Sequence, residues 1–235
     1  MTITTTPADV RTAPAVRGPV VGRRLAAAAL VVGAALNTAE AVLTWAVLGG
    51  RGRTTEEEIA AAFAHPGATT AIAVLGLASV PALLIGFQAM AHVVRGRLPR
   101  LGTVAAALAF VGTLGFLGMQ SLGLASAVLL NAGPQHTGAI TTLREAPLGL
   151  VVIAPFLIGM FGGLALLTAG LAAQRATRWI AGAFGLFLVL DLAVGAVGPV
   201  DPHWLFLAGS AGLAALVLRA GDDGWANARL SAAAV

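Results

Sequence analysis

Two carboxylates lie within long apolar stretches of this sequence, where acids are rare. Glu40 and Asp191 are the only acidic residues inside six such stretches. Because a charge in hydrocarbon is costly, an acid inside a membrane span is by default a functional-site hypothesis. Such an acid could exchange a proton, bind a ligand, or act as a general acid on an apolar substrate. We therefore take Glu40 and Asp191 as the candidate catalytic residues.

Amide and hydroxyl side chains are expected near these acids. Asn37, Glu40 and Thr44 follow the i, i+3, i+7 spacing of one helix face. A rise of about 1.5 Å per residue puts Glu40 and Asp191 near the bilayer midplane, slightly toward its outer side. Gln120 falls in the outer half of the third stretch. Because lipid-facing polar groups would be unsatisfied, we expect Asn37, Glu40, Gln120 and Asp191 to meet inside a helix bundle, with Thr44 as a further binding candidate on the same face as Glu40.

The same acids also have a purely structural interpretation. A Glu can bond to Asn, Gln or Thr across a helix interface and only hold the helices together. Gln88 and His92, four residues apart near the cytoplasmic end of the second stretch, are further binding candidates. A lone His at such a position is more often interfacial than a ligand.

No cofactor is expected. The chain has no Cys and no Tyr, and its fourteen basic residues are all Arg, so thiolate metal sites and a retinal Schiff base are excluded. A second His within the spans is absent, which excludes bis-histidine haem. Three outer His and one Asp would suit zinc, but their spacing matches no metal motif, so we predict no metal site. These weak candidates are His65, His136, His203 and Asp201.

The composition indicates which kind of secondary structure positions these residues. Hydrophobic residues make up 58% of the 235 and charged residues only 10%, which is typical of membrane proteins. The apolar runs are long enough to cross a bilayer. We predict an all-α polytopic bundle whose six transmembrane helices form one domain over 23–220. The spans are expected at about 25–49, 69–94, 101–131, 147–173, 179–199 and 203–219.

Arginine placement predicts the orientation. With the N-terminus inside, eleven Arg fall on the cytoplasmic side and three on the outer side. Both termini are therefore expected in the cytoplasm, with 1–22 as a disordered tail and 221–235 as a second tail. The net charge of +4 does not indicate nucleic acid, because the Arg lie at span ends rather than in one patch.

Shorter motifs refine this plan. Thr55 and Glu58 have the spacing of a capping box, which predicts an outer-surface helix over 55–64, stopped by Pro66-Gly67. Pro81 and Pro155 are mid-span and should kink their helices. Small residues allow close helix contact, and glycines repeat at helical spacing in two spans. They are Gly112, Gly115 and Gly118 in the third span and Gly159 and Gly163 in the fourth.

The six-span plan resembles small uncharacterised integral membrane proteins of actinobacterial type. The residues that carry the resemblance are GRRLAAAALVVGAALNTAEA (22–41), AHPGA (64–68) and RGRLPRLGTVAAALAFVG (95–112). The resemblance implies a multi-pass protein of the cytoplasmic membrane and supplies no catalytic residues.

Three functions follow from these features. The first is binding or transport of a small apolar molecule or of protons through the midplane acids, with the lipid bilayer and that ligand as the expected partners. The second is a membrane-embedded enzyme that acts on a lipid or isoprenoid by general acid catalysis, as a terpene cyclase does. The third is a structural or accessory subunit. Phenylalanines could shield a cation in the second case: Phe87, Phe110, Phe116, Phe156, Phe161, Phe184 and Phe187.

Overall fold

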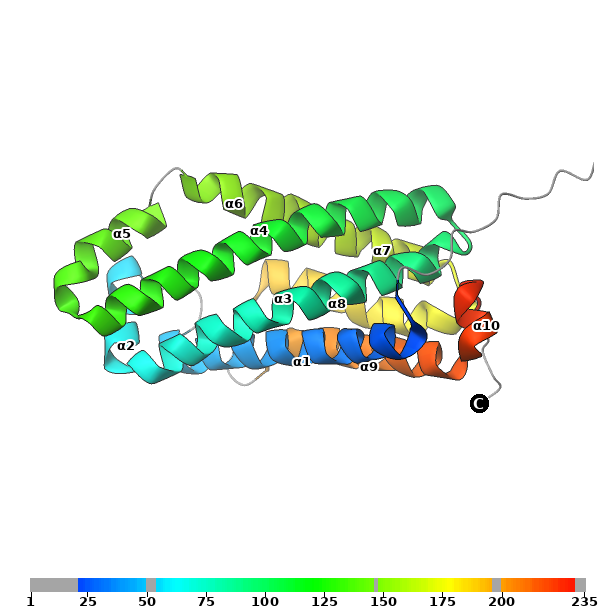
Figure 1. Ribbon diagram of the computed structural model, residues 1–235, viewed down its shortest axis with the longest axis horizontal. Coiled ribbons are helices and arrows are strands. Elements are labelled where there is room, and N and C mark those ends of the chain that lie inside the picture. The colour runs from blue at the N-terminus through cyan, green and yellow to red at the C-terminus, as the bar shows by residue number, and fades with distance from the viewer. Residues whose placement is uncertain (1–20, 50–53, 146–147, 196–199, 231–235) are drawn as a thin grey trace, which may run out of the picture.

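The computed structural model describes residues 21–49, 54–145, 148–195 and 200–230, and within them it contains helices and no β-strand. The long helices lie along one another in an elongated bundle (Figure 1). Among the described residues, five helices are long and apolar enough to cross a membrane, and one further apolar helix is shorter. The chain is thus an all-helical bundle of the multi-pass membrane type, as its composition predicts.

Three long helices form one side of the bundle. They are α1 (Arg23–Leu48), α3 (Pro66–Arg95) and α4 (Pro99–Ala132). Proline at the first turn favours the start of α3 and of α4, because that position needs no donated hydrogen bond. The 34 residues of α4 extend about 51 Å, well beyond a hydrocarbon core of about 30 Å. Gly33 lies against the backbone at Leu83, so α1 and α3 pack closely.

The fourth span is interrupted near its middle. It consists of α6 (Leu148–Phe156), a π-helical turn η2 (Leu157–Phe161) and α7 (Gly162–Ala172). The wide turn directly follows Pro155, which lacks the N–H that a regular helix would use. Pro81, by contrast, lies inside a continuous α3.

The glycines of the fourth span form its contact with α4. Gly112 lies against the backbone of Gly159, and Gly163 against the backbone of Ala109. A methyl group at any of these glycines would clash with backbone atoms. The close approach that the glycine spacing predicts is therefore present between these two spans.

The last two apolar helices are short. α8 (Arg178–Ala193) ends six residues before the predicted boundary at 199, and α9 (His203–Arg219) follows it. Gly195, at a φ of +70°, ends α8 in the left-handed conformation, and its N–H donates to the carbonyl oxygen of Leu190 at 2.8 Å. The apolar run continues beyond this stop, which is why hydropathy alone overestimates the helix.

Two surface helices cover one end of the bundle. α2 (Thr55–Ala64) occupies the predicted position, whereas the 3₁₀ turn η1 (Pro134–His136) and α5 (Thr137–Glu145) were not expected. They share a small core with α4 formed by Ile59, Ala62, Leu130 and Ile140.

The capping box of α2 lies one residue earlier than predicted. Thr54, not Thr55, is the N-cap, and its hydroxyl accepts a hydrogen bond from the N–H of Glu57 at 3.2 Å. The Glu57 carboxylate accepts one in return from the Thr54 N–H at 2.8 Å. Pro66 does not begin a loop but starts α3, and a single residue separates it from the end of α2.

The opposite, arginine-rich end carries the 3₁₀ turn η3 (Arg175–Thr177) and a last short helix, α10 (Gly221–Ala226). α10 lies within the segment predicted as a tail. Trp225 is buried there, and its indole N–H donates to the carbonyl oxygen of Val21 at 3.0 Å. The remaining tail predictions fall on 1–20 and 231–235, outside the described residues.

Candidate functional site

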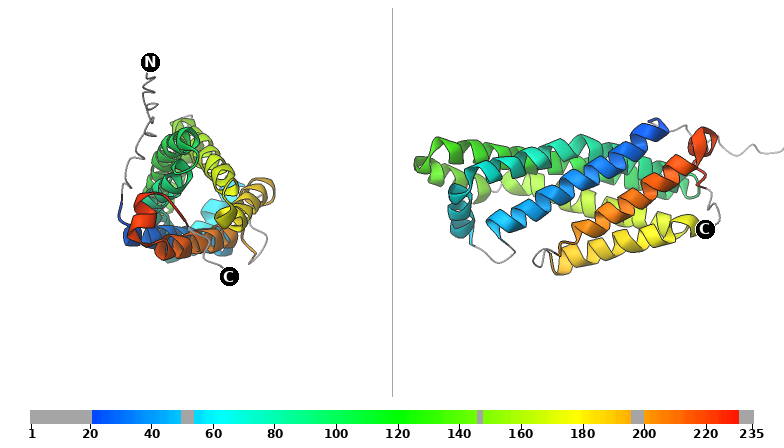
Figure 2. Two further views of the ribbon diagram at one scale, coloured as in Figure 1. Left: turned by 90° about the vertical axis from the view of Figure 1, so that its right-hand side faces the viewer. Right: turned by 90° about the horizontal axis from the view of Figure 1, so that it is seen from below.

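The start of α9 lies beside the middle of α1 rather than beside its end. The Thr38 hydroxyl contacts the carbonyl oxygen of His203 at 3.1 Å. Thr38 precedes Leu48, the last residue of α1, by ten residues, or about 15 Å of helix. Figure 2 shows the α8–α9 pair ending short of α1, α3 and α4.

A cavity of about 430 Å³, within the usual range for ligand pockets, is lined by residues of α1, α3, α4, the fourth span, α8 and α9. Its lining extends to Gly49 and Gly195, just past the ends of α1 and α8. The cavity therefore reaches from the middle of α1 toward the end of the bundle that lacks the arginine-rich turns.

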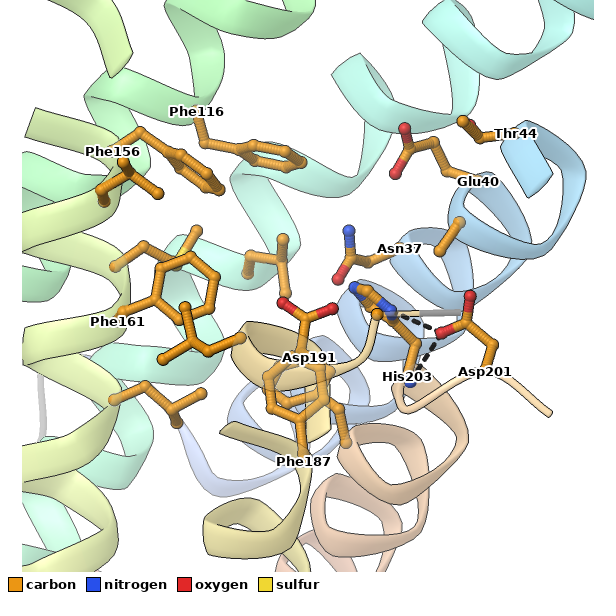
Figure 3. A pocket seen from close by; sticks show the side chains of 18 of the residues that line it. Asn37, Glu40, Thr44, Phe116, Phe156, Phe161, Phe187, Asp191, Asp201 and His203 are labelled. Atoms are coloured by element: carbon orange, nitrogen blue, oxygen red, sulfur yellow. Dashed lines mark hydrogen bonds and ion pairs between the residues drawn. The ribbon is translucent and has the colours of Figure 1, made fainter. Parts of the chain in front are cut away.

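Polar side chains from three segments line one part of this cavity. α1 contributes Asn37, Glu40 and Thr44, α8 contributes Asp191, and the start of α9 contributes the Asp201–His203 pair. Figure 3 shows their polar groups directed toward a common space. The structure thus brings Glu40 and Asp191 into one site, although they are 151 positions apart in the chain.

Aromatic side chains line the facing part of the cavity. Neighbouring rings contact each other: the centroids of Phe116 and Phe156 are 5.5 Å apart, and those of Phe156 and Phe161 5.7 Å. Phe156 and Phe161 flank and end the π-helical turn, so the irregular turn shapes this wall. Six of the nine phenylalanines of the chain are in the lining: Phe87, Phe116, Phe156, Phe161, Phe187 and Phe206.

The predicted aromatic set differs from this wall at three positions. Phe110 is 46% exposed on the outside of α4, and Phe184 is buried in the core. Phe206, which the sequence analysis did not include, is in the lining, with its ring centroid 5.2 Å from that of Phe187. α9 begins at His203, so its first turn lies beside the cavity. This position follows from the early end of α8, which the sequence analysis did not predict.

Glu40 is largely buried, with several polar groups near its carboxyl group. The side chains of Gln120 and Thr44 are adjacent to its carboxyl group, and His203 and Asp201 lie within electrostatic range. Gln120 is buried between α4 and Gly76 of α3, behind the cavity lining. The Thr44 hydroxyl is buried beside the same carboxyl group.

Asp191 lies nearer the end of its helix than predicted. Because α8 ends at Ala193, Asp191 is two residues from its last residue, not near the middle of a span. It still faces the same cavity as Glu40, because α8 packs against α9, and the start of α9 contacts α1 at Thr38. The predicted depth of Asp191 was counted from the inner end of its span, where α8 begins at Arg178, so the early outer end of α8 does not change it.

Asp201 and His203 form a bonded pair that the sequence analysis considered only as weak metal ligands. The Asp201 carboxylate accepts hydrogen bonds from the His203 backbone N–H at 2.8 Å and from its Nδ1 at 2.7 Å. Burial alone would raise the pKa of Asp201, but the bonds and charge of His203 outweigh it and hold that pKa below its usual value. An imidazole that donates from Nδ1 keeps Nε2 as an acceptor when neutral.

Gln88 and His92 lie outside the cavity lining, and the structure gives each of them a contact that links helices. Gln88 donates from Nε2 to the carbonyl oxygen of Ala106 at 3.3 Å, which links α3 to α4. His92 is buried and bonds through Nε2 to the carbonyl oxygen of Trp225 at 2.7 Å. A carbonyl can only accept, so Nε2 of His92 is the donor.

The outer histidines do not converge. Of His65, His136 and His203, only His203 lines the cavity, and the described residues contain no group of three His, Cys, Asp or Glu that could hold a metal ion. Comparison of the chain with protein-family models, with curated proteins and with solved structures finds no match.

Proposed function

We propose that this chain is a multi-pass protein of the cytoplasmic membrane that binds a small, largely apolar molecule in the cavity, as a carrier does. The observation that supports this most directly is the cavity itself, in which a phenylalanine wall faces a group of acids. The wall favours an apolar body, and the polar groups fix a polar end. The lining reaches the ends of α1 and α8, so access from that side favours a carrier.

The topology belongs to the same proposal. α9 is apolar but only 17 residues, about 26 Å long, and would serve as a sixth span that the bilayer accommodates by local thinning. The arginines at the ends of α3, α8 and α9 lie at one end of the bundle. This end would face the cytoplasm, together with both termini.

A general-acid enzyme acting on a lipid or isoprenoid is the second candidate function. It is favoured by the position of the acids opposite the aromatic wall, where a carbocation formed by protonation would be shielded. It predicts a new product when lipid extract is incubated with the protein, whereas a carrier returns its ligand unchanged.

Trp45 offers a direct test, because it lines the cavity. The neutral heavy-atom quencher 1-bromonaphthalene is titrated into the protein in detergent while tryptophan fluorescence is followed. We expect a saturable quenching component that Trp45→Phe removes. The tryptophans outside the cavity should give only unsaturable quenching from probe in the micelle.

A matched pair of variants on α1 identifies the site. Ala41 lines the cavity, whereas Ala46 is exposed on the same helix. Ala41→Phe should abolish the saturable component and Ala46→Phe should keep it. If Ala41→Phe, folded by size-exclusion chromatography, quenches like wild type, the cavity is not the binding site and the proposal is rejected.

A further inference from the structure

We propose that the occupant of this cavity is a lipid-like amphiphile, a compact polar group on an alkyl chain, which enters sideways from the bilayer between the fourth span and α8. The inference rests on the proposed function, since it specifies the class of apolar molecule and its route of entry. It is carried by the separation of these two helices, by the exposure of residues at their edges, and by the polar groups on the far wall.

The fourth span and α8 separate toward the end of the bundle that carries α2 and α5. α8 packs against α7, the second half of the fourth span, whereas α6 and η2 pack against α4. Figure 1 shows α7 beside α8 and α6 apart from it. The cavity lies between the separated parts, because its lining takes Leu157 and Phe161 from η2 and Phe187 and Leu192 from α8.

The edges of this separation are residues that border both the cavity and the exterior. Leu157 on η2 lines the cavity and is 45% exposed, and Leu192 on α8 lines it and is 56% exposed. In the fourth span 22% of the most apolar stretch is buried, and in the stretch that contains α8 28%, against 39% to 44% in α1, α3 and α4. Both helices thus present most of their surface to lipid, and the cavity opens to the bilayer at Leu157 and Leu192, the lateral portal.

Polar groups lie on the wall opposite η2. Asn37 lines the cavity from α1, and the bonded pair of Asp201 and His203 lines it at the start of α9. Figure 3 shows these three side chains across the cavity from Phe156 and Phe161. A polar group that leaves water needs hydrogen-bond partners, and apolar groups favour the aromatic wall. The occupant would therefore turn its polar group toward α1 and its apolar part toward the portal.

The size of the cavity indicates what happens to the apolar part. A volume of about 430 Å³ lies in the lower part of the range for drug-sized ligands. An alkyl chain that reaches from the midplane to one edge of the hydrocarbon core extends about 15 Å. Such a chain would leave through the portal and remain in lipid, while the cavity encloses the polar group and the first methylenes.

Chain length provides the first test, because methylenes that stay in lipid contribute nothing to the equilibrium between bilayer and cavity. The probes are 1-bromo-2-octanol and 1-bromo-2-hexadecanol, which carry the quenching bromine beside the hydroxyl group. Each is added to the purified full chain in phosphatidylcholine vesicles while tryptophan fluorescence is followed. We expect both to give a saturable component that Trp45→Phe removes, with half-saturating mole fractions in the bilayer that agree within about threefold.

Reversible blocking of the portal provides the second test. Leu157→Cys is the only cysteine of its variant, and benzyl methanethiosulfonate attaches a benzyl group to it that a reductant removes. The reaction is carried out in detergent before reconstitution. We expect the benzyl group to weaken binding of 1-bromo-2-hexadecanol on the order of tenfold or more, and reduction to restore it. 1-Bromonaphthalene has no alkyl chain to pass the portal and should keep its saturable component.

The neighbouring residue on the same turn is the matched control. Ile158 is 67% exposed and lies outside the described lining. Ile158→Cys carrying the same benzyl group should bind 1-bromo-2-hexadecanol as the wild type does. If Leu157→Cys fails to fold, Leu192→Cys at the other edge of the portal replaces it.

The outcomes separate the two proposals. Saturation by the octanol but not by the hexadecanol means that the cavity must enclose the whole chain, which overturns lateral entry. Benzyl groups at 157 and 158 with equal effects, or with none, overturn it as well. Saturable quenching by 1-bromonaphthalene would then leave the proposed function in place. Absence of a saturable component with all three probes overturns both.

Discussion

Asp201 is the residue that joins helix structure to the candidate site. Its carboxylate accepts two hydrogen bonds from His203 at the first turn of α9, and it also lines the cavity. A carboxylate at a helix N-terminus satisfies a free N–H and interacts favourably with the helix dipole. The same bonds fix the orientation of the imidazole.

Removal of these bonds should destabilise the start of α9. We expect Asp201→Ala to lower the free energy of unfolding by about 1–3 kcal/mol, because a buried N–H and the imidazole each lose their acceptor. Asp201→Asn keeps one acceptor oxygen and should lose less. Thermal unfolding of the three proteins in one detergent measures this order, and equal melting temperatures would contradict it.

The pH dependence of stability should report the same pair. The pKa of Asp201 is lower in the folded chain than its ordinary value of 3.8, so its contribution is fully present above that value and is lost as the pH falls below it. Melting temperatures of wild type should therefore drop more steeply below about 3.8 than those of Asp201→Asn. Parallel profiles would show that the bonds contribute nothing.

At the scale of elements, the contact between α4 and the fourth span depends on glycines, which have no side chain to separate the helices. Gly112 lies against the backbone of Gly159, whereas Gly123, also within α4, has open space around its missing Cβ. One helix thus provides both a tight and a free glycine.

These two glycines should respond to alanine in opposite directions. Gly112→Ala must separate the two helices and should cost about 1–3 kcal/mol. Gly123→Ala should stabilise α4 by about 0.5–1 kcal/mol, because alanine restricts the unfolded chain and favours the helix. Thermal unfolding of both variants decides the matter, and a stabilised Gly112→Ala would mean that the contact is looser than described.

The sequence predicts the long helices well and the short ones poorly. α1, α3 and α4 are bounded by arginine, proline or glycine at the ends of continuous apolar runs, so their limits differ from the predicted ones by three residues or fewer. α8 ends early although the apolar run continues, and the signal was Gly195, followed by Gly198-Pro199 in the sequence. A stricter use of glycine as a helix stop would have shortened this span.

The candidate site depends on that same error. Glu40, Asn37 and Thr44 could be grouped from the spacing within one helix, and the structure places all three in the cavity lining. Asp201 and His203 could not be added, because a span ending at 199 places them in an outer loop rather than beside Thr38. Which helices of a bundle become neighbours is not encoded in periodicity, so the aromatic wall was only partly predictable.

At the scale of the whole molecule, the proposed topology can be tested by single cysteine substitutions, because the chain has no native cysteine to remove first. Thr103 is exposed near the start of α4, and Glu56 is exposed on α2 at the other end of the bundle. With the arginine-rich end in the cytoplasm, a membrane-impermeant maleimide should label Glu56→Cys in intact cells. Thr103→Cys should react only after the membrane is permeabilised. The reverse labelling pattern would invert the orientation.

The depth of Glu40 along α1 has a consequence for the electrical behaviour of the protein. Glu40 precedes the end of α1 by eight of its 26 residues, so any positive charge that reaches it from the proposed outer side crosses roughly a third of the helix length. Moving one charge through the full membrane potential is worth about 2.3 kcal/mol per 100 mV, and a third of that is about 0.7 kcal/mol. An inside-negative potential of about 100 mV would therefore favour a positively charged occupant of the cavity over a neutral one by about threefold, so the resting voltage of the cell would bias the charge of what the site holds.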